Sequence, residues 1–207
     1  MTTRTIHVRR ATPDDIPALT PTLVAAFLHA PDAQWLIPDL NERRRVYQQL
    51  CPAFLTHVMT TGAVHTTTEH TGAALWLPHT TTHTADPRHT ARIERITDRH
   101  SDRFATLAEL LQAHAPRRPH LYLAHLGVTP ARQRHGIGTA LLTYRHATCD
   151  TAGTPIHLVA TSRAARDFYQ RLGYHPTTTT TLYLPDGGPP IWPMWRQPRT
   201  SPQGRQQ

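Results

Sequence analysis

The sequence contains no lysine, so all 22 of its basic residues are arginine. Against 14 acidic residues these give a formal net charge of +8. A basic domain often binds nucleic acid, because clustered positive charge attracts phosphate. Here the arginines are scattered, with only short runs such as residues 43–45 and 117–118, and no aromatic-rich RNA-binding signature accompanies them. We therefore expect no nucleic-acid partner, and we attribute the missing lysine to a coding bias.

Cysteine and long apolar runs are also scarce. The two cysteines, Cys51 and Cys149, lie far apart in the sequence and form no disulfide framework, so we expect a reducing, cytoplasmic location. The first residues carry no secretory segment, and no stretch approaches the ~20 apolar residues that span a bilayer. These absences predict a protein with no membrane partner. A chain of 207 residues has the size of one domain.

Histidine is plentiful, with 16 residues, but the spacing of a metal site is missing. Neither cysteine is paired at metal-ligand spacing, and the histidines in or near threonine-rich stretches are not aligned on a helix. We expect no bound metal, and we expect the following residues at the surface: His65, His70, His79, His83 and His89.

The hydrophobic pattern predicts strands and helices in alternation. We expect strands over residues 6–10, 62–66, 72–78, 120–128, 155–160, 175–184 and 192–196. We expect helices over residues 16–27, 47–58, 93–96, 104–111, 137–144 and 165–172. Thr12 and Pro13 favour the start of the first helix, residues 30–32 end it, and Ser101 is a cap for a later one. Residues 79–90 are typical of an irregular loop.

The most informative segment is a strand that ends in a glycine-rich turn before a helix. From Gln133 the spacing is Gln-x-x-Gly-x-Gly, so Gly136 and Gly138 leave the backbone bare where N–H groups can converge on an anion. Such a turn also fits a tight connection that binds nothing. The dinucleotide fingerprint and the P-loop are both excluded, because the third glycine and the Gly-Lys-Ser/Thr end are missing.

This turn, from Val128 to Gly138, resembles the acyl-coenzyme A pyrophosphate loop of the GNAT acetyltransferase superfamily. A second segment, residues 164–174, resembles the Phe-Tyr-x-x-x-Gly-Phe segment of the same superfamily. Over roughly residues 6–197 the chain is similar to the puromycin N-acetyltransferase-like branch of actinobacteria. The resemblance implies an α/β (α+β) fold with a mixed central β-sheet, splayed after the fourth strand and flanked by helices.

The resemblance also implies a division of the chain. Residues 1–197 would form a single domain, with acceptor-side elements in about residues 6–119 and the acyl-coenzyme A half in residues 120–197. Residues 198–207 are expected to be a disordered tail.

The site residues implied by the resemblance fall into two groups. Acetyl-coenzyme A would be the co-substrate, bound by Leu126, Val128, Gln133, Arg134, His135, Gly136, Ile137, Gly138, Thr139 and Phe168. Tyr169 is the catalytic candidate, since a phenol beside the sulfur can protonate the departing thiolate. His125 is a second candidate, which also fits a packed core histidine, and Tyr122 is a third. Because side chains alternate along a strand, we expect only one of Tyr122 and His125 to face the acceptor cleft.

Two positions depart from the pattern of that branch. A glutamate on the fifth strand that can deprotonate the acceptor is Val159 here, and an asparagine that helps to hold coenzyme A is Ala165. A general base is typically worth ~10² to 10⁴ in rate, so we expect acceptors that are weakly basic amines. Trp35 and Trp76 are candidate walls of the acceptor site.

The sequence therefore predicts an N-acetyltransferase, a monomer or homodimer, that moves an acetyl group directly to a primary amine of a small molecule. No acyl-enzyme is expected, because neither cysteine lies in a nucleophile motif. An aminonucleoside antibiotic, and hence drug resistance, is a suggestion by analogy alone. Two alternatives stay open at this point, a peptide or protein N-terminal acetyltransferase and a non-catalytic acyl-coenzyme A sensor.

Overall fold

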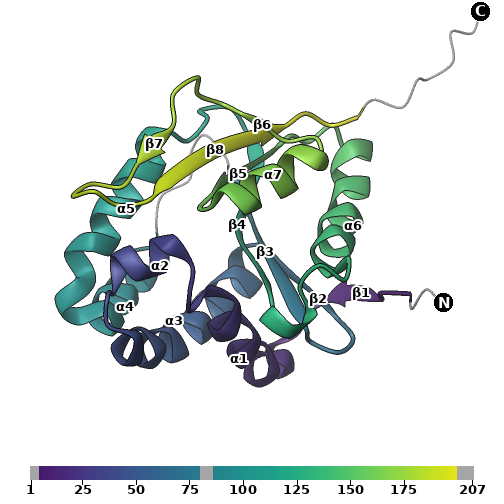
Figure 1. Ribbon diagram of the computed structural model, residues 1–207. Coiled ribbons are helices and arrows are strands. Elements are labelled where there is room, and N and C mark those ends of the chain that lie inside the picture. Colours follow the sequence, from purple (N-terminus) through teal and green to yellow (C-terminus); the bar gives the residue numbers. More distant parts are fainter. Residues whose placement is uncertain (1–4, 80–85, 200–207) are drawn as a thin grey trace, which may run out of the picture.

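The computed structural model describes residues 5–79 and 86–199 of the chain. Its centre is one mixed sheet with the strand order β1-β2-β3-β4-β5-β8-β6, and β7 pairs with β8 beside it (Figure 1). The strands are β1 (Val8–Arg10), β2 (Ala63–Thr67), β3 (Gly72–His79), β4 (His120–Val128), β5 (Ile156–Ala160), β6 (His175–Pro176), β7 (Leu182–Tyr183) and β8 (Pro190–Arg196). The β4–β5 pair is parallel, whereas the other pairs are antiparallel. The predicted mixed α/β architecture is confirmed.

Helices cover both faces of the sheet (Figure 1). They are α1 (Ile16–Phe27), α2 (Pro31–Leu36), α3 (Leu40–Thr61), α4 (Pro87–Thr97), α5 (Ser101–Ala113), α6 (Ile137–Thr151) and α7 (Arg163–Arg171), with short 3₁₀ turns η1 (Pro13–Asp15), η2 (Asp98–His100) and η3 (Pro130–Arg132). On one face α1 and α3 bury Leu23 and Leu50 with Leu75 of β3. On the other face α6 buries Leu141 against Leu158 of β5. The sheet therefore separates two apolar cores.

Several boundaries differ from the sequence prediction, and each difference has a local cause. Helix α4 begins at Pro87 inside the predicted irregular loop, because Asp86 caps its first turn and Pro87 fits the first helical position. Residues 30–32 begin α2, because Pro31 fits the first helical position. Ser101 is the first residue of α5 and makes no capping bond.

The predicted strand over residues 175–184 is wrong as a continuous element. Only two two-residue strands, β6 and β7, form there. Pro176 has no N–H to donate to a sheet ladder, and the residues of both strands are partly or fully exposed. The β-branched threonines therefore lack the packed neighbours that give such residues their strand preference.

Strand β4 carries a bulge that changes which side chains share a face. Leu121, Leu123 and Leu126 all pack in the α6-side core, although an unbroken strand would send residue 126 to the opposite face. The pairing with β3 slips at the same place, since Leu75 lies opposite His125 and Trp76 lies opposite Leu123. One extra residue in β4 explains both observations.

This bulge corrects a prediction from the sequence. Tyr122 precedes the extra residue and His125 follows it, so the two side chains lie on the same face of β4. Both line the cavity described below. The expectation that only one of them could face it was wrong, because it assumed strict alternation.

Beyond the bulge, β4 and β5 separate. They pair only from Leu121 to Leu123 of β4 and from Ile156 to Leu158 of β5, while β4 continues to Val128 beside β3 and β5 continues beside β8. The sheet is therefore splayed after its fourth strand, as predicted.

The histidines are distributed differently from the prediction. His65 is buried in β2, where its ring packs 5.1 Å from that of Tyr144, because β2 is covered by α6. His83 and residues 200–207 of the predicted tail lie outside the described residues. Over residues 5–79 and 86–199, no group of three or more His, Cys, Asp or Glu could hold a metal ion. Within the same residues no helix has the length and apolar character needed to traverse a bilayer.

Candidate active site

The loop between β4 and α6 presents backbone amides to solvent. Gly136, which caps α6, has a φ of 81°, a left-handed conformation that glycine adopts without penalty. The amide of Ala140 donates to the carbonyl of Gly136 at 2.9 Å, so the amides of residues 137–139 have no acceptor within the helix. Residues 133–136 are exposed. Free amides at the positive end of a helix form a site for an anion.

Contacts with β4 and α7 hold this loop in place. The Gln133 Nε2 atom donates to the carbonyl of Val128 at 3.2 Å. A Cβ atom on Gly138 would lie 3.3 Å from Phe168 Cζ and 3.8 Å from Leu126 Cδ2, so the bare backbone lets the Phe168 ring close against α6.

The predicted cofactor residues form one continuous region over the end of β4, the loop and α7. They are Leu126, Val128, Gln133, Arg134, His135, Gly136, Ile137, Gly138, Thr139 and Phe168. The side chain of Ile137 is buried, so this residue can offer a ligand only its amide.

A cavity of about 770 Å³ opens on the side of the sheet that α1 and α3 cover. Helices α1, α3, α4 and α5 form its walls, and residues 122–126 of β4 with residues 159–161 at and just after the end of β5 reach it at the split. Much of its lining is apolar, for example Phe27, Phe54 and Leu107. This volume is typical of a small-molecule site.

Two phenols line the cavity. Tyr122 comes from β4, and Tyr169 comes from α7. Burial raises the pKa of Tyr122 to about 12. Burial, together with the neighbouring Tyr122, also raises the pKa of Tyr169. Both groups therefore stay protonated at neutral pH, and each can donate a proton.

His125 lines the same cavity but packs as an aromatic ring. Its centroid lies 4.9 Å from that of Phe54 and 5.7 Å from that of Phe27. Burial lowers the pKa of His125 to about 4, so the imidazole is neutral at pH 7 and holds an extra proton weakly. The contacts and the pKa both favour packing over the role of a base.

Comparison with known proteins identifies the domain. Residues 99–176 match the family model described as an acetyltransferase (GNAT) domain. The match shows that this part of the chain is similar to a GNAT acetyltransferase domain. The chain is an acyltransferase with the GNAT fold, as the loop and the Phe168–Tyr169 pair predicted. The resemblance to the puromycin-like branch stays a prediction.

Solved structures match over nearly the whole chain. One, described as histone acetyltransferase HPA2 and related acetyltransferase from Corynebacterium glutamicum, is 25% identical with a TM-score of 0.67, covering 96% of this chain and 99% of that one. The arylalkylamine N-acetyltransferase 2 of Aedes aegypti is 10% identical with a TM-score of 0.62, covering 95% and 100%. The polyamine N-acetyltransferase of Drosophila melanogaster is 16% identical with a TM-score of 0.62, covering 93% and 100%.

The two departures noted in the sequence lie on β5 and α7, the elements that follow the split. Val159 and Ala165 both line the cavity. Val159 therefore puts an apolar side chain at the place where the resemblance implies a carboxylate.

A carboxylate does reach the cavity, from an element that the sequence analysis passed over. Asp32, in the first turn of α2, lines it near Thr161, which follows β5. Its Oδ1 atom is buried and has no hydrogen-bond partner within the described residues. Burial raises the pKa of Asp32, and hydrogen bonding from Thr161 opposes that rise. The one signal in the sequence was the Pro31-Asp32 pair, which is typical of a helix start.

The two tryptophans do not form the predicted walls. Trp76 is fully buried in the core under α6, because Leu75 and Leu77, its neighbours on β3, take the opposite face. Trp35 donates from Nε1 to the carbonyl of Pro185 at 3.0 Å. Neither residue lines the described part of the cavity.

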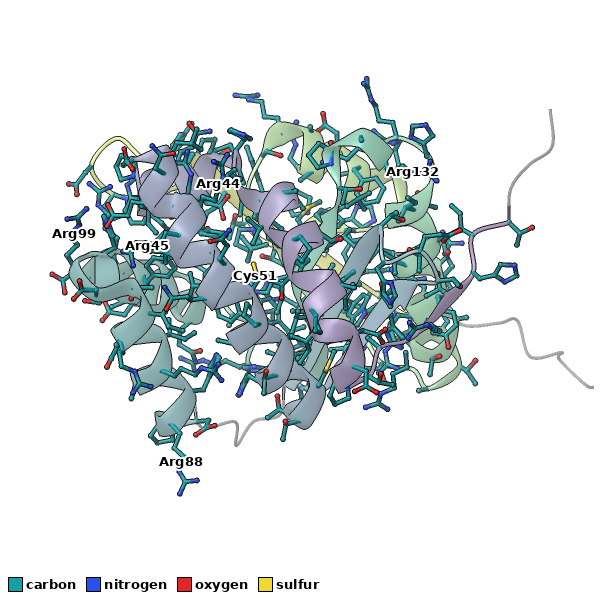
Figure 2. All side chains as sticks on the ribbon, turned by 90° about the horizontal axis from the view of Figure 1, so that it is seen from below. Arg44, Arg45, Cys51, Arg88, Arg99 and Arg132 are labelled. Atoms are coloured by element: carbon teal, nitrogen blue, oxygen red, sulfur yellow. The ribbon has the colours of Figure 1, made fainter. Side chains whose placement is uncertain are left out.

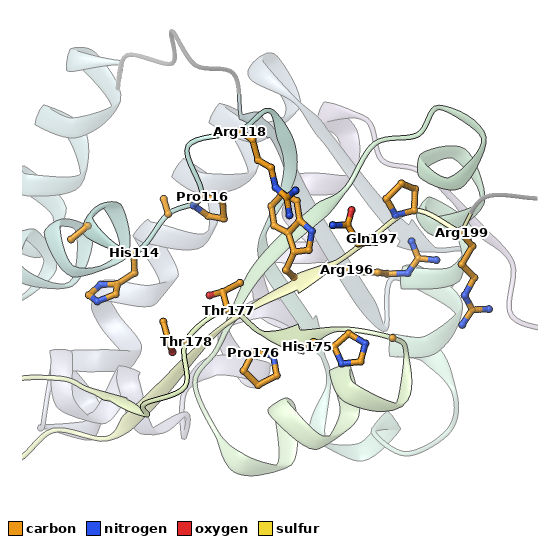
Figure 3. Close-up of a pocket in the computed structure, with 15 residues that line it drawn as sticks. His114, Pro116, Arg118, His175, Pro176, Thr177, Thr178, Arg196, Gln197 and Arg199 are labelled. Carbon is orange, nitrogen blue, oxygen red and sulfur yellow. The ribbon is translucent and has the colours of Figure 1, made fainter.

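A second hollow of about 870 Å³ lies near β6 and the end of β8 (Figure 3). Two of its arginines are engaged within the protein. Arg118 stacks on the ring of Trp195 at 4.1 Å, and Arg196 donates two hydrogen bonds to Asp150, at 2.7 and 2.8 Å. The phosphate loop and the tyrosines line none of it.

Proposed function

We propose that this chain is an N-acetyltransferase that transfers the acetyl group of acetyl-coenzyme A directly to a primary amine of a small molecule. The observation that carries the proposal is the split between β4 and β5. It separates an anion site at the start of α6 from an apolar cavity, and Leu126 adjoins both.

The residues present fit acetyl-coenzyme A. The amides of residues 137–139 and the exposed loop before them suit its diphosphate, and Leu126, Gly138 and Phe168 meet where its arm would enter the split. Acetyl-coenzyme A supplies the activated acetyl thioester. The exposed Arg134 adds positive charge beside the loop.

Tyr169 is proposed as the proton donor to the sulfur. It lines the cavity and stays protonated at neutral pH, as a general acid must. No acyl-enzyme is proposed, because burial raises the pKa of the Cys51 thiol to about 12 and so suppresses the thiolate that would attack.

The cavity favours a small acceptor over a peptide. Ile93 of α4 and Leu107 of α5 line it, so these two helices cover the site instead of leaving an open groove. Small-amine acetyltransferases also occur among the structures of the same fold. We include weakly basic amines such as those of aminonucleoside antibiotics among the acceptors, because Val159 replaces the glutamate of the branch that the sequence resembles.

The test is release of coenzyme A thiol from acetyl-coenzyme A over a panel of primary amines. Tyr169→Phe should lower kcat at least about 100-fold and leave the dissociation constant of acetyl-coenzyme A unchanged. Tyr174→Phe is the matched control, because Tyr174 is also a buried phenol, bonded to His146 at 2.8 Å and outside the cavity lining. A loss of only a few-fold in Tyr169→Phe would remove the proton-donor role. Binding of acetyl-coenzyme A without turnover of any amine would favour a sensor.

A further inference from the structure

The cavity carries the opposite charge to the protein as a whole. The chain has a formal net charge of +8, yet four acidic side chains and no arginine line the described part of the cavity. Three of these acids, Asp86, Glu94 and Asp102, are exposed at its edge. Arg88 and Arg99 belong to the same helical region but project at the outline of the molecule (Figure 2). The charge that reaches the cavity is therefore negative.

The fourth acid, Asp32, has an unsatisfied oxygen. Its buried Oδ1 atom has no hydrogen-bond partner within the described residues, and such an atom costs free energy unless a donor reaches it. His125, which lines the same cavity, gives no compensating positive charge, since burial lowers its pKa to about 4 and the imidazole is neutral at pH 7. The free lone pairs of Asp32 thus fit a donor that arrives with the ligand.

We propose that Asp32 is the acceptor-recognition residue, whose carboxylate binds the ammonium group of an apolar primary amine in the cavity. The inference rests on the proposed acetyl transfer and names its substrate class. An ammonium group supplies three hydrogen-bond donors and a positive charge. A buried carboxylate whose Oδ1 atom accepts no hydrogen bond lacks both a donor and a counter-charge. A charge-assisted bond of this kind is stronger in an apolar surrounding than in water.

The rest of the cavity indicates the body of that amine. Phe27, Leu50, Phe54 and Leu107 offer apolar contact. The acids at the edge disfavour any acceptor with a carboxylate or phosphate, because like charges repel. The class is therefore a primary amine with an aryl or alkyl body and no anionic group. This excludes acidic peptides, which the net charge of the chain alone would favour.

The test compares an amine with its uncharged analogue. With 4-phenylbutylamine as acceptor, Asp32→Asn should lower kcat/KM at least about 30-fold, because the amide keeps the shape but loses the charge. The dissociation constant of acetyl-coenzyme A and the melting temperature should stay close to those of the wild type. Asp14→Asn is the control for the same chemical change, since Asp14 is exposed on η1 and outside the cavity lining.

A binding readout separates recognition from rate. In the wild type, the dissociation constant of 4-phenylbutan-1-ol, measured by competition, should be at least about tenfold higher than that of 4-phenylbutylamine. In Asp32→Asn the two constants should differ by about threefold or less. Equal kcat/KM in the wild type and Asp32→Asn, or a preference for anionic acceptors, would overturn the inference and leave acetyl transfer intact. If the wild type released no thiol with any amine of the panel, the proposed function itself would be overturned.

Discussion

The two glycines that flank α6 allow a controlled test of the phosphate loop. Gly136 before the helix and Gly153 after it both have positive φ, 81° and 63°. Neither is crowded, because a Cβ on Gly136 would meet only Ile6 Cδ1 at 3.6 Å and a Cβ on Gly153 would meet nothing within 4 Å. Alanine at either position therefore introduces the same strain, about 1–2 kcal/mol, and little else.

The two substitutions should differ in where this strain is felt. In Gly153→Ala it can only lower the free energy of unfolding, which for a chain of this size lowers the melting temperature by about 2–8 °C. In Gly136→Ala the loop can relax in the free protein and must then be forced back when the diphosphate binds. The dissociation constant of acetyl-coenzyme A should rise by about 5- to 30-fold, with a smaller loss of stability.

The assay is calorimetric titration of both variants with acetyl-coenzyme A, together with urea unfolding. Gly153→Ala should bind within about twofold of the wild type, since its site is at the far end of the helix. Equal dissociation constants in the two variants would refute the assignment of the diphosphate to this loop. Weakened binding in Gly153→Ala would show instead that strain anywhere in α6 is sufficient.

Three further outcomes follow from buried groups. Burial lowers the pKa of His125 to about 4 and that of His157 to about 3, so below pH 6.5 the unfolded chain binds more protons than the folded one. In urea unfolding, the free energy of unfolding should be greatest above pH 6.5 and should fall by about 1.4 kcal/mol per pH unit for each group as the pH falls toward 4. A free energy of unfolding that does not change with pH would contradict this. Asp150→Asn leaves the buried guanidinium of Arg196 without its carboxylate, so the free energy of unfolding should fall by about 3–5 kcal/mol; a loss below 1 kcal/mol would mean that solvent satisfies the arginine. At pH 8 the Cys51 thiol, with its raised pKa, should react with an aromatic disulfide about a thousandfold more slowly in the native protein than in denaturant; comparable rates would show an accessible thiolate.

The phosphate loop could be predicted because its signal is local. A glycine that needs positive φ at Gly136 and a bare position at Gly138 are properties of a few consecutive residues, and the helix that follows repeats its apolar residues at the expected spacing. Strand β4, before the loop, could be predicted as well, because a central strand covered on both faces is rich in apolar residues. The order of the elements therefore followed from the sequence.

The arrangement inside the cavity depends on long-range pairing and could not be read in the same way. The bulge in β4 exists only in its register with β3, and nothing in residues 122–125 marks it. Without it, Tyr122 and His125 fall on opposite faces, which was the prediction. The predicted strand over residues 175–184 failed for a related reason, since strand preference in Thr-rich sequence needs a packed partner.

The carboxylate that reaches the cavity, Asp32, comes from a different element than the resemblance implies. In the branch that the sequence resembles, the carboxylate near the acceptor lies on the fifth strand, and that position is Val159 here. Asp32 belongs to α2, about 130 residues earlier in the chain, yet it meets Thr161, which lies just beyond the end of β5 and lines the cavity together with Val159. The apolar side chain of Val159 lowers the polarity of the cavity that Asp32 lines, and a carboxylate interacts more strongly with a cation in such a surrounding.

A carboxylate that recognises the ammonium group also sets which amines can react. The bound amine must lose a proton before it attacks the thioester, and the free energy for that step rises with the pKa of the amine. Burial raises the pKa of Asp32. This reduces the difference between the pKa of Asp32 and that of the amine by the same amount for every acceptor. The difference between acceptors is therefore the difference in their own pKa values, about 2.6 units between an ε-amine and an α-amine, or roughly 400-fold in neutral amine. This factor falls within the ~10² to 10⁴ that a dedicated base is worth, so an enzyme that has Val159 in place of the glutamate and Asp32 as its cation site is suited to weakly basic amines with apolar bodies.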